Sequence, residues 1–165
     1  MIFPQPIQPE PNQESVWDYP RPPRIEPSNK RIQVVFRDIT IADSVRSQRI
    51  LETSHPPVYY IPPEDVDMSY IQPSSHQSYC EWKGIAHYYT IAVGEEKSIN
   101  AAWYYPNPTD YFAVLKNYLA FYPSRVDACY VDGERVTAQA GDFYGGWITK
   151  NIVGPFKGGM GTRVW

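Results

Sequence analysis

The sequence predicts a mainly β fold, a compact antiparallel domain with one or two short helices. From Arg31 onward, short runs of β-branched and aromatic residues alternate with turn residues, as in antiparallel sheets. The 165 residues are 42% hydrophobic and 20% charged, which supplies apolar material for one packed core. The compositional outliers are 17 prolines and 14 tyrosines, so turns and aromatic packing should shape the fold.

Residues 1–23 are predicted to form a proline-rich extended arm. Eight prolines lie within the first 27 residues, and this density excludes a helix or a central strand. Its second half carries Trp17 and Tyr19, which are unusual in a free linker. We expect this half to dock on the body or on a neighbouring subunit, so a homo-oligomer could form through the arm. The first dozen residues are expected to be a disordered leader.

The strands are justified by turn signals between apolar runs. Arg37-Asp38, Pro56-Pro57 and Asp132-Gly133 mark turns, and Gly94–Ser98 forms a polar hairpin connection between the two longest runs. These two longest runs should form the centre of the sheet. We expect strands, in order, at residues 31–36, 39–42, 49–53, 58–61, 85–93, 99–105, 119–122 and 128–131.

Two segments favour helix, and the last segment favours irregular structure. Residues 62–66 begin with prolines and acids and suit one helical turn, and residues 110–116 suit about two turns after Thr109. Seven of the ten glycines follow residue 138, interleaved with aromatic residues. We therefore expect residues 138–165 to form an extension held on the domain by aromatic side chains.

Charge, cysteine content and hydropathy exclude several classes of protein. The net charge of -3 gives no electrostatic footprint for nucleic acid, and no apolar run is long enough to span a membrane. Cys80 and Cys129 are far apart, which excludes a disulfide scaffold and a four-ligand zinc pattern. We expect a cytoplasmic protein without a metal site or a cofactor.

Five motifs, taken in order, resemble the DUF427 family, and the resemblance covers roughly residues 23–134. It implies a β domain over residues 24–137, a tent-like Mss4-like fold and no established activity. Residues 138–165 look like the extension of cyanobacterial and plastid-type members. The motifs lie at residues 41–44, 58–62, 79–84, 102–108 and 120–122.

Members of this family have been labelled nucleotidyltransferases, and the residues support that label weakly. Asp65 and Asp67 have the spacing of a metal-holding carboxylate pair. However, no Gly-rich phosphate loop accompanies them, and solvated surface acids are the simpler interpretation. Magnesium-dependent nucleotidyl transfer is therefore the weakest alternative.

Cys80 and Lys83 are the candidate catalytic residues, together with Glu52. A lysine near a cysteine favours the reactive thiolate when both face one pocket. Three residues of extended strand would place them on opposite faces, so the contact requires a turn, which Gly84 allows. The alternatives are a buried apolar Cys80, a surface Lys83 and a Glu52 paired only for structural reasons.

Neighbouring aromatic residues should divide between the two faces of the sheet, because side chains alternate along a strand. One face would form the core, and the other a band of rings that binds a small organic ligand. The alternatives are a face covered by the arm and the extension, and a structural or regulatory module that binds a protein. The candidate ligand-binding residues are Ser44, Tyr60, Tyr89, Trp103 and Tyr105.

Overall fold

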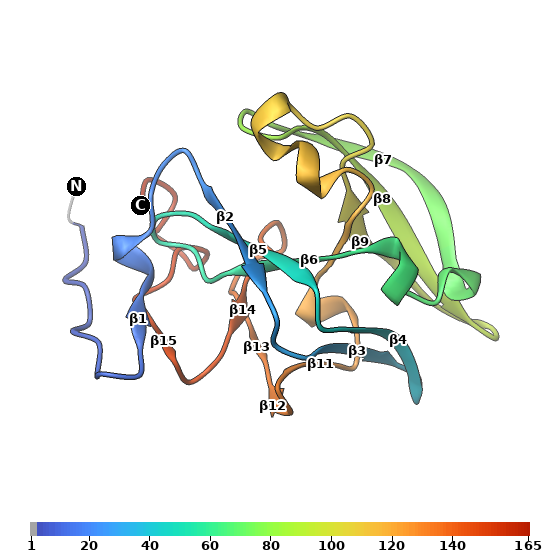
Figure 1. The fold of residues 1–165 in the computed structure, drawn as a ribbon, viewed down its shortest axis with the longest axis horizontal. Coiled ribbons are helices and arrows are strands. Elements are labelled where there is room, and N and C mark those ends of the chain that lie inside the picture. The colour runs from blue at the N-terminus through green and yellow to red at the C-terminus, as the bar shows by residue number, and fades with distance from the viewer. Residues whose placement is uncertain (1–2) are drawn as a thin grey trace.

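The computed structural model describes residues 3–165, so residues 1–2 of the predicted arm lie outside the described residues. Two antiparallel sheets dominate the fold (Figure 1), and the predicted mainly β class is confirmed. Helical structure consists of short 3₁₀ turns, of which the longest has six residues. None of these helices in residues 3–165 has the length and hydropathy needed to cross a membrane.

The larger sheet has seven strands in the spatial order β2-β5-β6-β10-β9-β8-β7, and every neighbouring pair is antiparallel. The short central strand β10 is buried at all of its residues. The strands are β2 (Arg24–Ser28), β5 (Ser47–Leu51), β6 (Val58–Ile61), β10 (Leu119–Phe121), β9 (Glu96–Tyr104), β8 (Gly84–Val93) and β7 (Ile71–Cys80).

The second sheet has four strands in the order β12-β11-β3-β4. Arg37 and Asp38 join β3 to β4 with φ of 49° and 64°, the left-handed conformation that a tight hairpin turn requires. The predicted hairpin at this position is confirmed. The strands are β3 (Ile32–Phe36), β4 (Ile39–Ser44), β11 (Ala128–Val131) and β12 (Glu134–Arg135).

Two small sheets and five 3₁₀ turns complete the fold. β1 (Glu14–Ser15) pairs in parallel with β15 (Ile152–Val153), and β13 (Thr137–Ala138) pairs with β14 (Trp147–Ile148). The 3₁₀ turns are η1 (Val16–Asp18), η2 (Pro63–Asp65), η3 (Met68–Tyr70), η4 (Asp110–Leu115) and η5 (Pro123–Arg125).

The central strands of the seven-stranded sheet are covered on both faces. One face packs against the four-stranded sheet, and Ile32, Ile61, Leu119 and other mainly aliphatic side chains fill the space between them. On the opposite face the same strands present mostly aromatic side chains, and η4 packs over these through Phe112 and Leu115. The predicted exposed band of rings is therefore wrong, because a covering loop buries this face.

Three expectations about the elements need correction. Strands β8 and β9 do not form the sheet centre, since β10 lies between β6 and β9 while β7 occupies the edge beyond β8. Strand β7 has no counterpart among the predicted strands, because it is polar and contains Pro73, as an edge strand can. The segment 110–116 is a 3₁₀ turn with a kink at Phe112 rather than an α-helix.

The arm and the C-terminal extension lie side by side at one end of the molecule (Figure 1). Val16 and Tyr19 are buried, and Val16 packs with Leu51 and Ile152. Trp17 donates a hydrogen bond from Nε1 to the carbonyl oxygen of Pro155 at 2.9 Å. These arm side chains therefore pack within their own chain.

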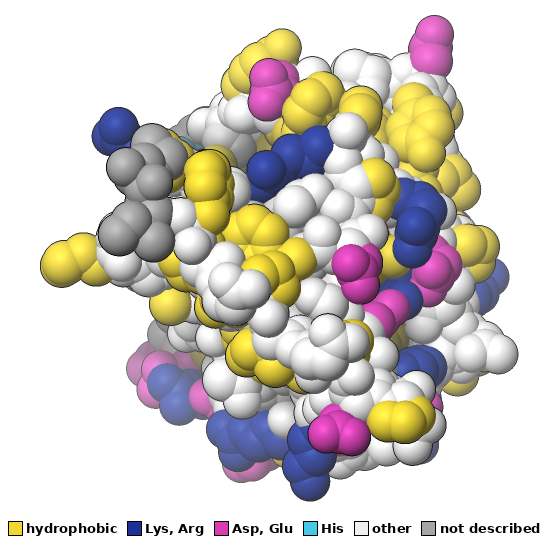
Figure 2. Space-filling model, turned by 90° about the vertical axis from the view of Figure 1, so that its left-hand side faces the viewer, with side chains coloured by type: hydrophobic (Ala, Val, Ile, Leu, Met, Phe, Trp, Pro, Cys, Tyr) yellow, Lys and Arg dark blue, Asp and Glu magenta, His cyan; other side chains and the backbone are white. Residues whose placement is uncertain are grey.

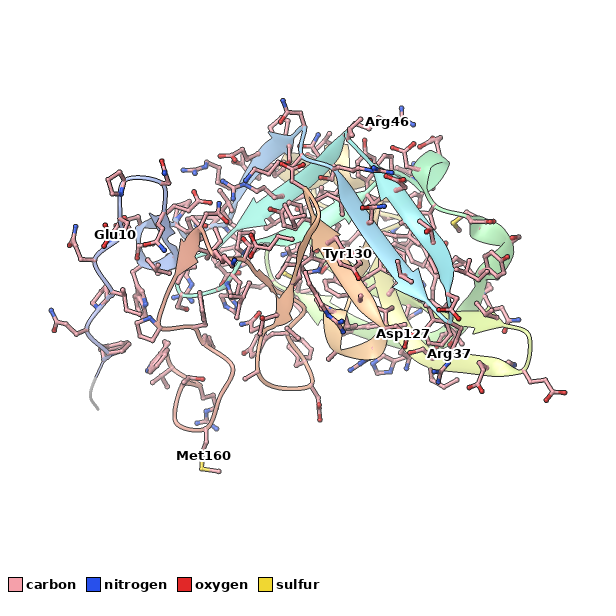
Figure 3. All side chains as sticks on the ribbon, turned by 90° about the horizontal axis from the view of Figure 1, so that it is seen from below. Glu10, Arg37, Arg46, Asp127, Tyr130 and Met160 are labelled. Carbon is pink, nitrogen blue, oxygen red and sulfur yellow. The ribbon has the colours of Figure 1, made fainter. Side chains whose placement is uncertain are left out.

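Charged side chains are distributed over the surface. On the face that carries the arm, positive and negative side chains are interspersed among hydrophobic and uncharged ones (Figure 2). Figure 3 shows Glu10 on the arm at one end of the view and Arg37 with Asp127 at the other. There the Asp127 carboxylate accepts a hydrogen bond from the backbone N–H of Arg37.

Candidate functional site

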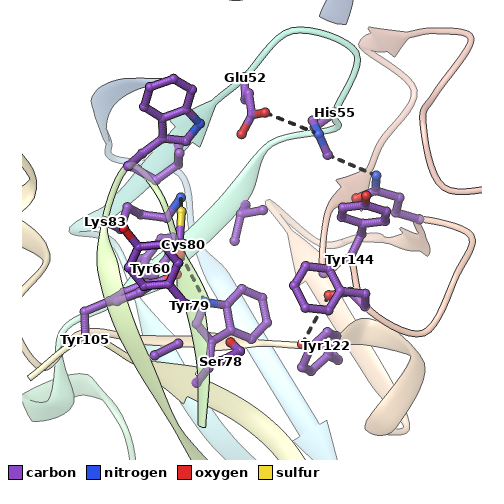
Figure 4. Close-up of a pocket in the computed structure, with 18 of the residues that line it drawn as sticks. Glu52, His55, Tyr60, Ser78, Tyr79, Cys80, Lys83, Tyr105, Tyr122 and Tyr144 are labelled. Carbon is purple, nitrogen blue, oxygen red and sulfur yellow. Dashed lines mark hydrogen bonds and ion pairs between the residues drawn. The ribbon is translucent and has the colours of Figure 1, made fainter. Parts of the chain in front are cut away.

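A cavity of about 290 Å³ opens on the aromatic face of the seven-stranded sheet. Rings carried by the sheet strands form one wall, and three further parts of the chain surround it: the β5–β6 connection, the β7–β8 hairpin and the C-terminal extension around Tyr144. Aromatic side chains predominate in the lining, and polar groups lie at two separate places (Figure 4). Six of the eight residues proposed from the sequence line it, namely Glu52, Tyr60, Cys80, Lys83, Trp103 and Tyr105.

The rings of Tyr60, Trp103, Tyr105 and Tyr122 form a contiguous wall. The Tyr60 and Trp103 rings meet edge to face, with centroids 6.2 Å apart and an interplanar angle of 89°. Trp103 Nε1 donates a hydrogen bond to Tyr60 Oη at 3.1 Å, and the Trp103 and Tyr122 centroids are 4.6 Å apart. Such contacts fix the orientation of the rings before any ligand binds.

Burial keeps the hydroxyl groups of this wall in their neutral form. It raises the pKa of Tyr60, Tyr105 and Tyr122 above the usual value for tyrosine, because an ionised phenolate would lose its hydration. Each phenol can therefore donate as well as accept a hydrogen bond near neutral pH. The wall offers apolar faces together with a few fixed polar atoms.

Cys80 and Lys83 lie together at the tip of the β7–β8 hairpin. Lys83 Nζ is 3.5 Å from Cys80 Sγ. The two side chains are therefore in contact, and the turn that this contact requires is present. Gly84 follows with φ of 108°, a conformation that favours glycine. The Lys83 side chain is buried and lies 5.6 Å from the ring centroid of Phe112. A thiol and an amine thus share one end of the cavity.

Glu52 and His55 form the second polar group, away from Cys80 and Lys83 (Figure 4). Glu52 Oε2 is 3.1 Å from Arg21 Nε and 3.5 Å from His55 Nε2. His55 Nδ1 lies 3.3 Å from Gln139 Nε2 of the extension. Burial is the main cause that lowers the pKa of His55 to about 4, so its imidazole is neutral at pH 7.

Two proposed ligand-binding residues lie elsewhere. Ser44 Oγ donates a hydrogen bond to Asp65 Oδ2 at 2.7 Å, on the four-stranded sheet and away from the cavity. Tyr89 lies on the opposite face of β8, where its ring stacks on that of Tyr104 with centroids 4.2 Å apart. The assignment of Ser44 and Tyr89 to this site is therefore wrong.

Tyr88 lines the cavity in place of Tyr89, because it pairs with Trp103 in the β8–β9 ladder. The register of this ladder shifts between Tyr89 and Ile91, so the register at the turn, Val93 with Glu96, would by itself have placed Ala86 opposite Trp103. His55 also had no local signal, because its partner Gln139 is 84 residues away.

The carboxylate pair considered for magnesium is already engaged. Asp65 accepts hydrogen bonds from Arg46 at 2.8 and 2.9 Å, and these contacts lower its pKa. Asp67 caps η3 through the backbone N–H of Ser69. Within residues 3–165, no group of three or more His, Cys, Asp or Glu side chains is arranged to hold a metal ion.

A family comparison fits this architecture. The family model described as a domain of unknown function (DUF427) matches residues 24–132, most of the chain. The chain belongs to this family. No curated protein matches the sequence. The DUF427 domain runs from β2 through β11, and it contains Cys80, Lys83 and the tyrosines of β6 and β8.

The extension lies outside the DUF427 match and still contributes to the cavity. Gln139, Tyr144 and Lys157 line it, and Gly145 packs closely against the Trp103 ring. A Cβ atom at Gly145 would lie 2.3 Å from Trp103 Cη2, so glycine permits this contact. The complete cavity therefore requires both the DUF427 domain and the extension.

Proposed function

We propose that this protein binds a small organic molecule in the aromatic cavity. The observation that carries the proposal is the oriented wall of Tyr60, Trp103, Tyr105 and Tyr122 beside an open volume of about 290 Å³. Concave sites lined by aromatic rings with few polar groups are the usual form of small-molecule sites. The volume suits one or two fused rings.

Two features of the site support a ligand rather than purely structural packing. Cys80, Lys83 and His55 are among the polar groups at the margin of a space lined largely by aromatic rings, where they could orient a bound molecule. The extension closes one side of the cavity by a contact that only glycine at residue 145 allows. We assign Cys80 and Lys83 to the recognition of the ligand and Glu52 to holding His55.

The proposal is tested with naphthalene-2-carboxamide, a neutral two-ring probe. Binding is measured from the transverse relaxation of the probe's ring protons while the full chain is titrated in. Tyr88→Leu removes a ring that lines the cavity and should weaken binding about tenfold. Tyr89→Leu removes the neighbouring ring on the opposite face and should change binding by less than about twofold.

Equal effects of these two variants would contradict the proposed location, and no binding to the parent protein would contradict the proposed function. Thermal melting of both variants checks that each is folded at the temperature of the titration. The two residues are adjacent in β8, so the comparison isolates the face of the sheet.

A further inference from the structure

Lys83 carries a buried amine in a fixed position. The residue is 8% exposed, and its carbonyl oxygen accepts a hydrogen bond from the backbone N–H of Thr109 at 3.1 Å. Thr109 Oγ1 also donates to the carbonyl oxygen of Trp82 at 2.6 Å. The hairpin tip is therefore tied to the loop before η4, and the backbone that carries the Lys83 side chain is held in place before a ligand arrives.

The Lys83 ammonium lacks an anionic partner within the part of the chain that the structure describes. None of the ion pairs formed by residues 3–165 includes it, and its polar contact is the Cys80 thiol at 3.5 Å. The ring centroids of Phe112 and Tyr105, at 5.6 and 6.0 Å, supply only partial compensation. Buried charges in proteins are normally paired, so this amine lacks a counter-ion.

The other groups around the cavity do not supply that counter-ion. Glu52 is held by Arg21 and His55, at 3.1 and 3.5 Å. Glu81 belongs to the same hairpin tip and is exposed, and it forms no ion pair with Lys83. Lys157 adds a second positive charge to the lining. The described residues that line the cavity therefore leave Lys83 without a paired negative charge.

We propose that the ligand is an aromatic carboxylate, whose ring system lies against Trp103 and Tyr60 and whose anionic group binds Lys83 Nζ. This inference rests on the proposed function and specifies its ligand class. One ammonium and one thiol at this end of the cavity match a single charge, whereas a phosphate dianion would call for a larger set of donors. The carboxylate supplies the charge that Lys83 lacks.

Three probes with the same naphthalene body separate charge from shape: naphthalene-2-carboxylate, naphthalene-2-carboxamide and 2-naphthyl phosphate. The full-length parent protein should bind the carboxylate at least about tenfold more tightly than the carboxamide, and more tightly than the phosphate. In Lys83→Met this preference for the carboxylate over the carboxamide should disappear. Lys97→Met, at an exposed lysine of β9, should keep the preference.

A stability measurement gives an independent result. Replacing an uncompensated buried ammonium by a neutral side chain of similar length should raise the melting temperature of the ligand-free protein. Lys97→Met should leave that temperature almost unchanged. A lysine that only supported the fold would give a lower melting temperature when replaced.

Each failure has a distinct meaning. Equal binding of carboxylate and carboxamide to the parent protein overturns the anionic ligand while the proposed function stands. Tighter binding of the phosphate overturns the assignment to a carboxylate. Loss of the preference in Lys157→Met but not in Lys83→Met overturns the role of Lys83. If none of the three probes binds, the proposed function is overturned together with this inference.

Discussion

The two faces of the seven-stranded sheet are built from the same strands but differ in what covers them. The face toward the four-stranded sheet is filled mainly by aliphatic side chains such as Ile61, Ile91 and Leu119, all fully buried. The opposite face carries tyrosines and Trp103, and loops, a hairpin tip and the extension cover it. A second sheet covers most of one face, whereas separate segments leave the aromatic cavity open on the other.

The two faces of the sheet therefore have different roles: the aliphatic face stabilises the fold, and the aromatic face carries the proposed binding site. Close packing between sheets leaves no room for a ligand, and its loss costs free energy of folding directly. The aromatic face retains the partly buried Cys80 and His55 and the buried Lys83, whose charge and reactivity depend on the covering segments. Perturbations on the aliphatic face should therefore change stability, and those on the aromatic face should mainly change binding, pH dependence and reactivity.

The largest effect should come from Trp147→Ala on the aliphatic face. Trp147 is fully buried, and its Nε1 donates a hydrogen bond to the carbonyl oxygen of Phe121 at 3.1 Å. Its loss should lower the free energy of unfolding by about 3–5 kcal/mol, measured by urea denaturation. Phe143→Ala, in the same extension but 63% exposed, should cost less than about 1 kcal/mol. Similar losses of unfolding free energy in Trp147→Ala and Phe143→Ala would mean that the extension does not belong to the main core.

The next effect is the pH dependence contributed by His55 on the aromatic side. The unfolded chain binds a proton near pH 6.5, whereas burial lowers the pKa of folded His55 to about 4. The contribution of His55 to the free energy of unfolding is therefore complete above pH 6.5. It is lost as the pH falls from 6.5 to 4, and the loss amounts to about 3 kcal/mol. In His55→Gln, the loss of stability from pH 7 to pH 4 should shrink by this amount.

His76→Gln, on the edge strand β7, is the matched control for His55 and should keep the parent's loss of stability. Denaturation curves at pH 7, 5.5 and 4 provide the measurement. An unchanged pH dependence in His55→Gln would show that His55 is not a neutral buried imidazole.

A smaller effect should follow Gly145→Ala, which closes the cavity from the side of the extension. The new methyl group would meet Trp103 Cη2 at 2.3 Å, and overpacking of this kind costs about 1–3 kcal/mol. Binding of naphthalene-2-carboxamide should weaken at the same time. Gly159→Ala, where no atom lies within 4 Å of the new methyl group, should change neither quantity. Unaltered binding in Gly145→Ala would place the probe away from Trp103.

The smallest effect concerns the two cysteines, one for each face. Cys129 lies in the aliphatic core, where burial raises the pKa of its thiol, so it should react with a thiol reagent only after unfolding. Cys80 is partly exposed and should react in the folded protein. Lys83→Met should slow Cys80 about tenfold, because the ammonium at 3.5 Å attracts negative charge on the sulfur. An inert Cys80, or a rate unchanged in Lys83→Met, would remove it from the site.

Local sequence patterns predicted most of the strands. They did not predict a strand whose side-chain exposure depends on its position in the sheet. The β3–β4 hairpin follows from β-branched residues around Arg37-Asp38, whose turn needs no help from distant parts of the chain. Strand β7 has only one neighbour and exposes most of its side chains, so its sequence lacks both apolar alternation and hydrophobic content. An edge position is a property of the whole sheet, so the local sequence of residues 71–80 does not indicate it.

The same limit applies to the site. Alternation along β6 and β9 correctly grouped Tyr60 with Trp103 and Tyr105, and a turn at Gly84 brought Lys83 to Cys80. The choice of Tyr88 over Tyr89 depends on the register shift in the β8–β9 ladder, which the turn between these strands does not reveal. Ser44 could not be excluded from the sequence either, because its partner Asp65 is reached only through a turn of the following segment.

The sequence by itself determined that neighbouring rings such as Tyr59 and Tyr60 lie on opposite faces, because alternation along a strand is a local property of the backbone. It also determined the turns, through residues that tolerate left-handed or proline conformations. Only the tertiary structure decided which face is sealed and which holds a cavity. That outcome depends on η4, the β7–β8 hairpin and the extension meeting over the same rings, and contacts between such distant segments arise from the packing of the whole chain.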